Sequence, residues 1–289
     1  MKLAIETDLG GDPDDFFAIC YLIAAGVDIK CIVISPGYLH QVAIAKFICR
    51  ELGLDIPIGA AKGGYEKKFN LNGFHQKLLK LKGHELTSEE DGVGARILRQ
   101  TFEAHPDCEF FGIGPLLNMN KLLEEHPSIR IPRATMQGGF LAYQLHNYPC
   151  VRLHKFEGKL EVPSFNPNGC PAGMLAFAEA DIPDRQFVCK NVCHTVVYDN
   201  EKNELMGLSE NTSKAYDMFK EAMRVYGKQK KFHDPTAAVC HLHPEVASWV
   251  RGKPYRNRGC WGTRLQEDGD KVIADIDRDL LWEHIIQGT

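Results

Sequence analysis

Five carboxylates stand between residues 6 and 15, with no Lys or Arg among them, directly after the apolar run Leu3-Ala4-Ile5. They are Glu6, Asp8, Asp12, Asp14 and Asp15. Two unit charges about 4 Å apart repel by roughly 4 kcal/mol at an intermediate dielectric, so carboxylates crowded in a cleft must take up protons or bind a cation. Because every ligand would be an oxygen atom, the segment favours a hard ion, Ca²⁺ or Mg²⁺.

The same segment also has the features of a helix start. Asp12 followed by Pro13 is a good N-cap and first helical residue, and Asp14 and Asp15 would complement the helix dipole. Helix capping does not explain Glu6 and Asp8, because we place them upstream in the strand-to-helix loop. We therefore expect a metal site in addition to a helix N-terminus.

A second motif with chemical potential is His233-Asp234-Pro235, which precedes an apolar run. Asp234 as N-cap with Pro235 as the first helical residue is one interpretation. The alternative is that the Asp234 carboxylate also faces the acidic cluster of the N-terminal segment. The motif alone does not decide between the two.

Two amides, Asn166 and Asn168, lie in the Pro- and Gly-containing segment 162–169, which we expect to form a rigid turn. Asn is a common turn residue. Amides two residues apart could instead bind neighbouring hydroxyl groups of a polyol such as ribose. Both interpretations stay open.

Apolar segments of strand and helix character alternate along the first half of the chain. The predicted elements there are 2–7, 14–25, 29–35, 40–52, 56–59, 92–104, 109–113, 116–125 and 134–138. This alternation predicts an α/β fold, a single domain over residues 1–289 with a mostly parallel open sheet and helices on both faces. The second half should add helices at 170–180 and 211–226, another after Asp234, a final helix, and strands at 187–193 and around 263–275.

Ligands of parallel sheets bind beyond the carboxyl ends of the strands. Four polar or glycine-rich turns are expected there: those at Asp8, Ser35-Pro36-Gly37, Gly112 and Gly138-Gly139. The sequence therefore predicts that these turns converge on one rim of the sheet.

Composition narrows the class of protein. The chain has 289 residues, 44% hydrophobic and 25% charged, with a net charge of -4, so we expect no general attraction to nucleic acid or anionic membranes. No run of about 18 apolar residues is present, and the N-terminus turns acidic early, so we expect a soluble, cytoplasmic protein. Residues 62–84 are locally basic, and we predict a mobile surface loop there.

The ten cysteines are scattered, which favours reduced thiols over a disulfide framework. Cys189, Cys193 and His194 form a small cluster, but no second ligand pair follows at zinc-finger spacing. We therefore do not predict a metal there.

Taken together, the motifs resemble the nucleoside hydrolase family, the inosine-uridine type N-ribohydrolases, over nearly the whole chain. The resemblance is carried by residues 6–18, ETDLGGDPDDFFA, and by His233-Asp234-Pro235. Weaker support comes from residues 112–118, GIGPLLN, from 136–139, MQGG, and from Phe165-Asn166. The order and the spacing of all five segments agree with the family pattern.

The resemblance implies a Ca²⁺ ion held by Asp8, Asp15, Asp234 and the backbone carbonyl of Ile113, with Mg²⁺ a weaker alternative. Asp8 would be the general base and would activate a water molecule jointly with the metal. His233 is the candidate acid for the leaving base, or else a residue that caps or packs beside the metal site.

The resemblance also implies substrate contacts. Asp14 and Asn166 would bind ribose hydroxyls, with Asn168 a further candidate, and Met136 would pack near the sugar. N-glycoside cleavage passes through an oxocarbenium-like transition state, which nearby carboxylates stabilise. A nucleoside or related N-riboside is thus the expected substrate, and a homo-oligomer is expected because relatives commonly assemble.

Two positions depart from the family pattern around the ribose 5'-hydroxyl. Tyr38 stands where typical members have Asn, and Ser164 stands where a Glu usually precedes the Phe-Asn pair. These changes suggest a modified 5' position, for example a phosphorylated or enlarged substrate, or altered sugar recognition. Tyr38 could stack on substrate, close the pocket or serve packing alone.

Two other classes of function fit parts of the sequence. Aspartate clusters at strand ends also serve Mg²⁺-dependent phosphohydrolases, although no P-loop is present. A catalytically silent ribose- or nucleoside-binding protein would keep the metal site but lose productive contacts at Tyr38 and Ser164. The preferred base is not specified by any of these motifs.

Overall fold

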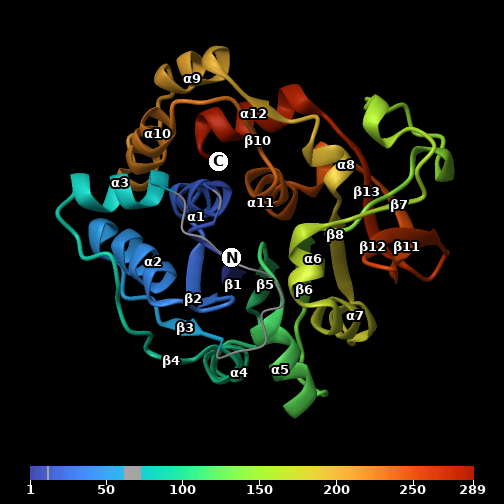
Figure 1. Ribbon diagram of the computed structural model, residues 1–289, viewed down its shortest axis with the longest axis horizontal. Helices are drawn as coiled ribbons and strands as arrows, with labels where there is room; N and C mark the ends of the chain where they lie inside the picture. The colour runs from blue at the N-terminus through green and yellow to red at the C-terminus, as the bar shows by residue number, and fades with distance from the viewer. Residues whose placement is uncertain (12, 62–72) are drawn as a thin grey trace.

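The computed structural model describes residues 1–11, 13–61 and 73–289, in which one sheet joins strands from both ends of the chain (Figure 1). Its strand order is β4-β3-β2-β1-β5-β6-β8-β13-β11-β12-β7. Neighbours from β4 to β13 are parallel, whereas β11, β12 and β7 extend the sheet with antiparallel pairs. The predicted mostly parallel α/β sheet is confirmed.

The strands of this sheet are β1 (Lys2–Thr7), β2 (Asp28–Ile34), β3 (Ile58–Ala60), β4 (Gly92–Val93), β5 (Glu109–Gly112), β6 (Arg133–Gln137), β7 (Glu161–Val162), β8 (Asp184–Val188), β11 (Ala247–Asn257), β12 (Cys260–Leu265) and β13 (Asp270–Ile276). A separate antiparallel pair is formed by β9 (Val197–Tyr198) and β10 (Lys230–Lys231).

The α-helices are α1 (Asp14–Ala24), α2 (Leu39–Leu52), α3 (Gly73–Leu81), α4 (Gly94–Ala104), α5 (Leu117–Glu125), α6 (Phe165–Gly169), α7 (Pro171–Glu179), α8 (Lys190–Cys193), α9 (Asn200–Gly207), α10 (Lys214–Tyr226), α11 (Asp234–Leu242) and α12 (Arg278–Gln287). Short 3-10 turns are η1 (Tyr143–Leu145), η2 (His154–Phe156) and η3 (Pro244–Val246).

Helices cover the sheet in two layers (Figure 1). On one side α4, α5 and α7 pack side by side, and on the other α1 packs against α10 and α11. Between the layers, Leu3, Ala4 and Ile5 of β1 are fully buried, as expected for a central parallel strand. The sheet and α1 thus give the N-terminal acidic segment a rigid base.

The strand predicted at 187–193 is only partly correct. β8 ends at Val188, and residues 190–193 form the helical turn α8. The Cys189 carbonyl accepts hydrogen bonds from the backbone amides of Val192 (3.1 Å) and Cys193 (3.2 Å), which bends the chain out of the sheet. Sequence analysis also missed β11, because Gly252 and Pro254 interrupt its strand pattern.

The segment predicted as a mobile loop, 62–84, lies partly outside the described residues, because 62–72 are not described. From Gly73 to Leu81 the prediction was wrong, since α3 is a regular helix. Its Phe74 ring packs edge-on against Phe16 and Phe17 of α1. Burial of this aromatic group holds α3 on the body of the molecule.

All ten cysteines are free, in agreement with the prediction of reduced thiols. Within the described ranges, Cys189, Cys193 and His194 do not form a group of converging metal ligands. No helix among the described residues has both the length and the apolar character needed to cross a membrane.

His75 of α3 is fully buried against the rings of Phe16 and Phe74, and neither ring nitrogen has a hydrogen-bond partner among the described residues. Burial lowers its pKa from 6.5 to about 3. Below pH 6.5 the unfolded chain therefore binds a proton at His75, whereas the folded protein binds it only near pH 3. Stability is lost as the pH falls from 6.5 toward 3.

We predict that His75→Leu removes part of this acid sensitivity. At about pH 5 the wild type should lose about 2 kcal/mol of unfolding free energy, relative to neutral pH, that the variant keeps. Urea denaturation at a series of pH values measures the difference. His154→Leu is the matched control, because that ring is almost fully exposed. Parallel pH profiles for wild type and His75→Leu would contradict the prediction.

Candidate functional site

Four neighbouring parallel strands, β2, β1, β5 and β6, end along one edge of the sheet. The residues that follow them are Ser35, Asp8, Ile113 and Gly138. The predicted convergence of the four turns on one rim is therefore confirmed, and this rim is the candidate active site.

Glu6 lies beneath this rim and is fully buried. Its Oε1 accepts hydrogen bonds from Ser35 Oγ (2.6 Å) and the Asn118 amide (2.7 Å), and its Oε2 accepts one from the Met119 amide (3.0 Å). Burial raises the pKa of Glu6 to about 7, although these hydrogen bonds act to lower it. The sequence analysis placed Glu6 in the loop, but it belongs to β1 and joins β1 to the N-terminus of α5.

Asp8 and Asp15 are 7% and 2% exposed and are linked through the residue before Asp8. Thr7 Oγ1 donates a hydrogen bond to Asp15 and accepts one from the Leu9 amide (3.1 Å). The turn after β5 packs directly on this segment, because a Cβ added to Gly114 would lie 2.4 Å from the Asp8 amide nitrogen. The chain at Ile113 is thus held beside Asp8.

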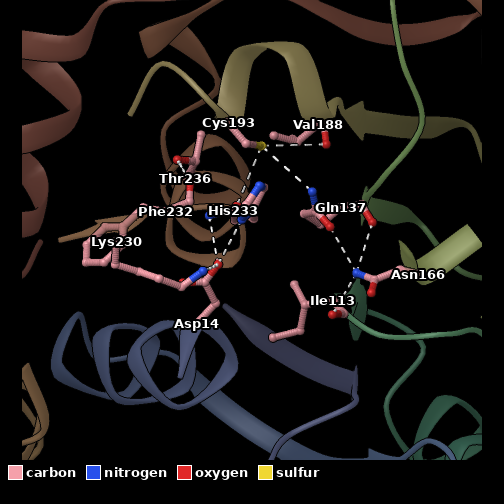
Figure 2. A network of polar contacts seen from close by, with 10 residues as sticks. All are labelled: Asp14, Ile113, Gln137, Asn166, Val188, Cys193, Lys230, Phe232, His233 and Thr236. Atoms are coloured by element: carbon pink, nitrogen blue, oxygen red, sulfur yellow. Dashed lines mark hydrogen bonds and ion pairs between the residues drawn. The ribbon is translucent and has the colours of Figure 1, made fainter. Parts of the chain in front are cut away.

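Asp14 connects the start of α1 to the start of α11 (Figure 2). Its Oδ2 accepts a hydrogen bond from the His233 amide (3.1 Å) and lies 3.1 Å from His233 Nδ1 and 3.2 Å from Lys230 Nζ. Burial pushes the pKa of Asp14 upward, but the His233 hydrogen bond and the Lys230 charge outweigh it and lower this pKa. The contacts bring Asp234, the next residue of α11, to the same rim.

Asn166 closes the other side of the rim. Its Nδ2 donates to the Ile113 carbonyl (2.9 Å) and to Gln137 Oε1 (2.9 Å). Gln137 Nε2 in turn donates to Cys193 Sγ (3.8 Å), whose thiol donates to the His233 carbonyl (3.8 Å). Figure 2 shows this continuous chain of polar contacts from Asn166 to Asp14.

Comparison with known proteins identifies the family. The sequence model of the inosine-uridine preferring nucleoside hydrolases matches residues 3–283. The chain belongs to this family. Its members are hydrolases that act on N-glycosyl bonds. An uncharacterised protein of Aquifex aeolicus is 23% identical over 304 residues, covering 98% of this chain and 97% of the relative.

Solved nucleoside hydrolases share the fold. A plant nucleoside hydrolase superposes with a TM-score of 0.77 at 18% identity, covering 100% of this chain and 99% of the other. An inosine-uridine preferring nucleoside hydrolase from Bacillus anthracis gives a TM-score of 0.75 at 16% identity, with the same coverage. A purine-preferring ribonucleoside hydrolase from Gardnerella vaginalis gives 0.71 at 14% identity, covering 100% and 98%.

Not every predicted site residue of this nucleoside hydrolase reaches the rim. Segment 162–169 is not a rigid turn: it ends β7 and then forms the short helix α6. Helical geometry points residues two apart in different directions. Asn168 accordingly donates to the Gly259 carbonyl (2.7 Å) and accepts from Trp261 Nε1 (2.9 Å), so the structure does not bring it together with Asn166.

Ser164, Met136 and Tyr38 have identifiable structural contacts. Ser164 Oγ accepts a hydrogen bond from the Gly139 amide (3.1 Å) and is buried. Met136 is fully buried within β6. Tyr38 precedes α2, is 44% exposed, and stacks on His40 at 5.5 Å between ring centroids.

Lys230 and Gln137 were missed by sequence analysis. The signal for Lys230 was its position in a Lys-Lys pair shortly before His233-Asp234, and Gln137 lay within the MQGG segment. Neither position reveals its long-range partner from the sequence alone. Asp12 belongs to the predicted acidic cluster but lies outside the described residues.

The segments that carry Asp8, Asp15, Asp234 and the Ile113 carbonyl therefore meet at one rim, and the three carboxylates are buried. Asn166 uses one lone pair of the Ile113 carbonyl oxygen and leaves the second for another partner. A donor set made only of oxygen atoms suits a hard divalent cation such as Ca²⁺ or Mg²⁺ better than zinc, which binds mainly through Cys and His.

We predict that Glu6→Ala destabilises the fold by about 2 kcal/mol or more, because buried donors on Ser35, Asn118 and Met119 lose their acceptor. Urea denaturation gives the free energy of unfolding. Glu103→Ala on α4, which removes an exposed ion pair, should change it by less than about 0.5 kcal/mol. Equal effects of the two substitutions would refute the structural role of Glu6.

Proposed function

We propose that the protein hydrolyses the N-glycosidic bond of a ribonucleoside or related N-riboside, releasing the free base and ribose with the help of one divalent cation. The observation that carries this proposal is the meeting of Asp8, Asp14, Asp15 and Asp234 at one rim in a member of the nucleoside hydrolase family. A strand end and two helix N-termini supply these four acids.

The cation we propose is Ca²⁺, with Mg²⁺ the weaker candidate, and its ligands would be Asp8, Asp15, Asp234 and the Ile113 carbonyl. Ca²⁺ accepts six to eight oxygens in flexible geometry, which suits carboxylates from separate elements. When bound, the ion would orient ribose hydroxyls and a water molecule and lower the pKa of that water.

Asp8 is the general base in this proposal: its carboxylate takes the proton from the attacking water. As the C1'–N bond lengthens, positive charge develops on the ribose ring. The buried carboxylates around the sugar stabilise that charge, and they do so strongly because the site is shielded from bulk water.

Asp14 and Asn166 are the ribose-binding residues we propose. Lys230 and His233 keep Asp14 ionised and fix its orientation, so its carboxylate can accept a ribose hydroxyl proton. Asn166 donates through Nδ2 to Ile113 and Gln137, and its Oδ1 accepts no hydrogen bond from the described residues. That oxygen is therefore available to a second ribose hydroxyl.

His233 is the residue we propose to protonate the leaving base. The imidazole contacts Asp14 through Nδ1, so its other ring nitrogen, Nε2, points away from Asp14. The side chain of His233 is 26% exposed, so it can reach a ligand at the rim. The homo-oligomeric state and the cytoplasmic location stay predictions.

We predict that Asp8→Asn lowers the rate of ribose release by a factor of about 100 to 10,000, because an amide cannot accept the proton from water. Reducing-sugar release across a panel of purine and pyrimidine nucleosides measures this, and circular dichroism checks that the variant is folded. Asp268→Asn, in the exposed turn between β12 and β13, is the control and should keep full activity. Undiminished activity of Asp8→Asn would eliminate Asp8 as the base.

A second prediction concerns the metal. Chelation should abolish ribose release, and added Ca²⁺ should restore it better than Mg²⁺. Ca²⁺ at about 100 times its dissociation constant should also stabilise the wild type by about 2.7 kcal/mol, because it binds only the folded chain. Asp234→Asn should lose most of this stabilisation in thermal unfolding experiments. Full activity in protein shown by elemental analysis to lack metal would contradict the proposal.

A further inference from the structure

Three lysines and one histidine lie beside the candidate active site and have no role in the reaction proposed above. We call Lys155, Lys190, Lys231 and His194 the lysine cluster. They come from three elements outside the main sheet: η2 carries Lys155, α8 carries Lys190 and is followed by His194, and β10 carries Lys231. Chain segments far apart in the sequence thus bring three lysines together around His194, whose pKa burial and the neighbouring positive charges lower to about 2.

The lysine cluster is connected to the rim by direct contacts. Lys155 Nζ donates to His194 Nδ1, and the His194 ring packs edge-on against the His233 ring at 5.0 Å between centroids. His233 in turn contacts Asp14. The cluster therefore begins one ring away from the residue that is proposed to bind ribose.

The two lysines of β10 point to opposite sides of the strand, because successive side chains alternate. Lys230 is largely buried and pairs with Asp14, whereas Lys231 is exposed and lies near Lys155. At the other end of the cluster, Lys190 Nζ donates to the Pro163 carbonyl at 3.0 Å. The residue after Pro163 is the neutral Ser164, so no carboxylate at that position opposes an anion.

Two members of the cluster, Lys155 and Lys231, carry charges that no described carboxylate pairs with. Among residues 1–11, 13–61 and 73–289, neither Lys155 nor Lys231 forms an ion pair with a carboxylate. Partial burial and the nearby Lys231 and Lys190 charges lower the pKa of Lys155 to about 8. This local excess of cations contrasts with the net charge of -4 of the whole chain.

We propose that the lysine cluster binds a phosphate group carried on the ribose, so that the preferred substrate is a ribonucleoside 5'-phosphate. This inference rests on the proposed function and specifies its substrate. A phosphate offers three acceptor oxygens, and three neighbouring lysines supply matching charge-assisted donors. Lysine side chains bind phosphate well as point charges.

The reaction balances without a further reactant. The water oxygen forms a bond to C1', the C1'–N bond breaks, and its electron pair leaves with the base. Asp8 takes one proton of the water, and His233 supplies the proton that the base acquires. The phosphate ester stays intact, so the products are ribose 5-phosphate and the free base.

The first test compares kcat/KM for ribose 5-phosphate release from uridine 5'-monophosphate and inosine 5'-monophosphate with kcat/KM for ribose release from uridine and inosine. We expect the phosphorylated substrate to be preferred by about tenfold or more. In Lys155→Gln/Lys231→Gln this preference should fall by about tenfold, because two charge-assisted contacts are lost. Lys121→Gln, on the exposed surface of α5, is the control for the loss of a lysine elsewhere and should keep the wild-type preference.

The outcomes separate this inference from the proposed function. Cleavage of nucleosides with no preference for the phosphorylated substrates overturns the inference and leaves the N-ribohydrolase proposal intact. No base release from any substrate contradicts the proposed function itself. A preference that survives in Lys155→Gln/Lys231→Gln also overturns the role of the cluster.

A binding measurement tests the preference for a 5'-phosphate without catalysis. By calorimetry, ribose 5-phosphate should bind about tenfold or more tightly than ribose, and the double substitution should remove most of this difference. Equal affinities for ribose and ribose 5-phosphate would overturn the inference. Inorganic phosphate that binds as tightly as ribose 5-phosphate would overturn it as well, because it would indicate an anion site unconnected to the sugar.

Discussion

The buried carboxylate of Glu6 is the contact on which the geometry of the rim depends. It accepts hydrogen bonds from the loop after β2 and from the first turn of α5, while its own strand, β1, leads directly into Asp8. A carboxylate taken out of water is costly unless donors surround it, so these partners hold one another in place. The strand that delivers Asp8 is therefore fixed from below before any ligand arrives.

A second constraint acts from the opposite side of the site. Asp14 opens α1 and holds His233, which precedes α11, so two helix N-termini meet at one point. The positive ends of two helix dipoles favour negative charge there, and the Lys230 ammonium adds to the effect. The protein thus offsets the repulsion among its acids partly with its own backbone and side chains.

Much of the fold was predictable because the physics involved is local. The buried run Leu3-Ala4-Ile5 followed by acids and a helix indicates a strand that ends in a site, and the repetition of this pattern indicates a parallel sheet. Asp8, Asp14, Asp15 and Asp234 could be selected in the same way, since strand ends and helix starts are visible in a sequence.

The features that the sequence did not predict depend on the directions in which side chains point. Glu6 was grouped with the acids of the loop because of its charge, although the predicted strand 2–7 already included it. Asn168 was paired with Asn166 because a Pro- and Gly-containing segment suggests a turn, whereas a short helix turns Asn168 toward Trp261. The contact between Lys230 and Asp14 joins distant parts of the chain, and no local pattern predicts such a pair.

The place of β13 in the sheet has a consequence for biosynthesis. This strand comes from the end of the chain, yet it lies between β8 and β11 and packs parallel to β8. Until β13 has been made, the edge of β8 that pairs with it is open. A product that ends before β13 therefore has an exposed strand edge, which favours pairing with other chains.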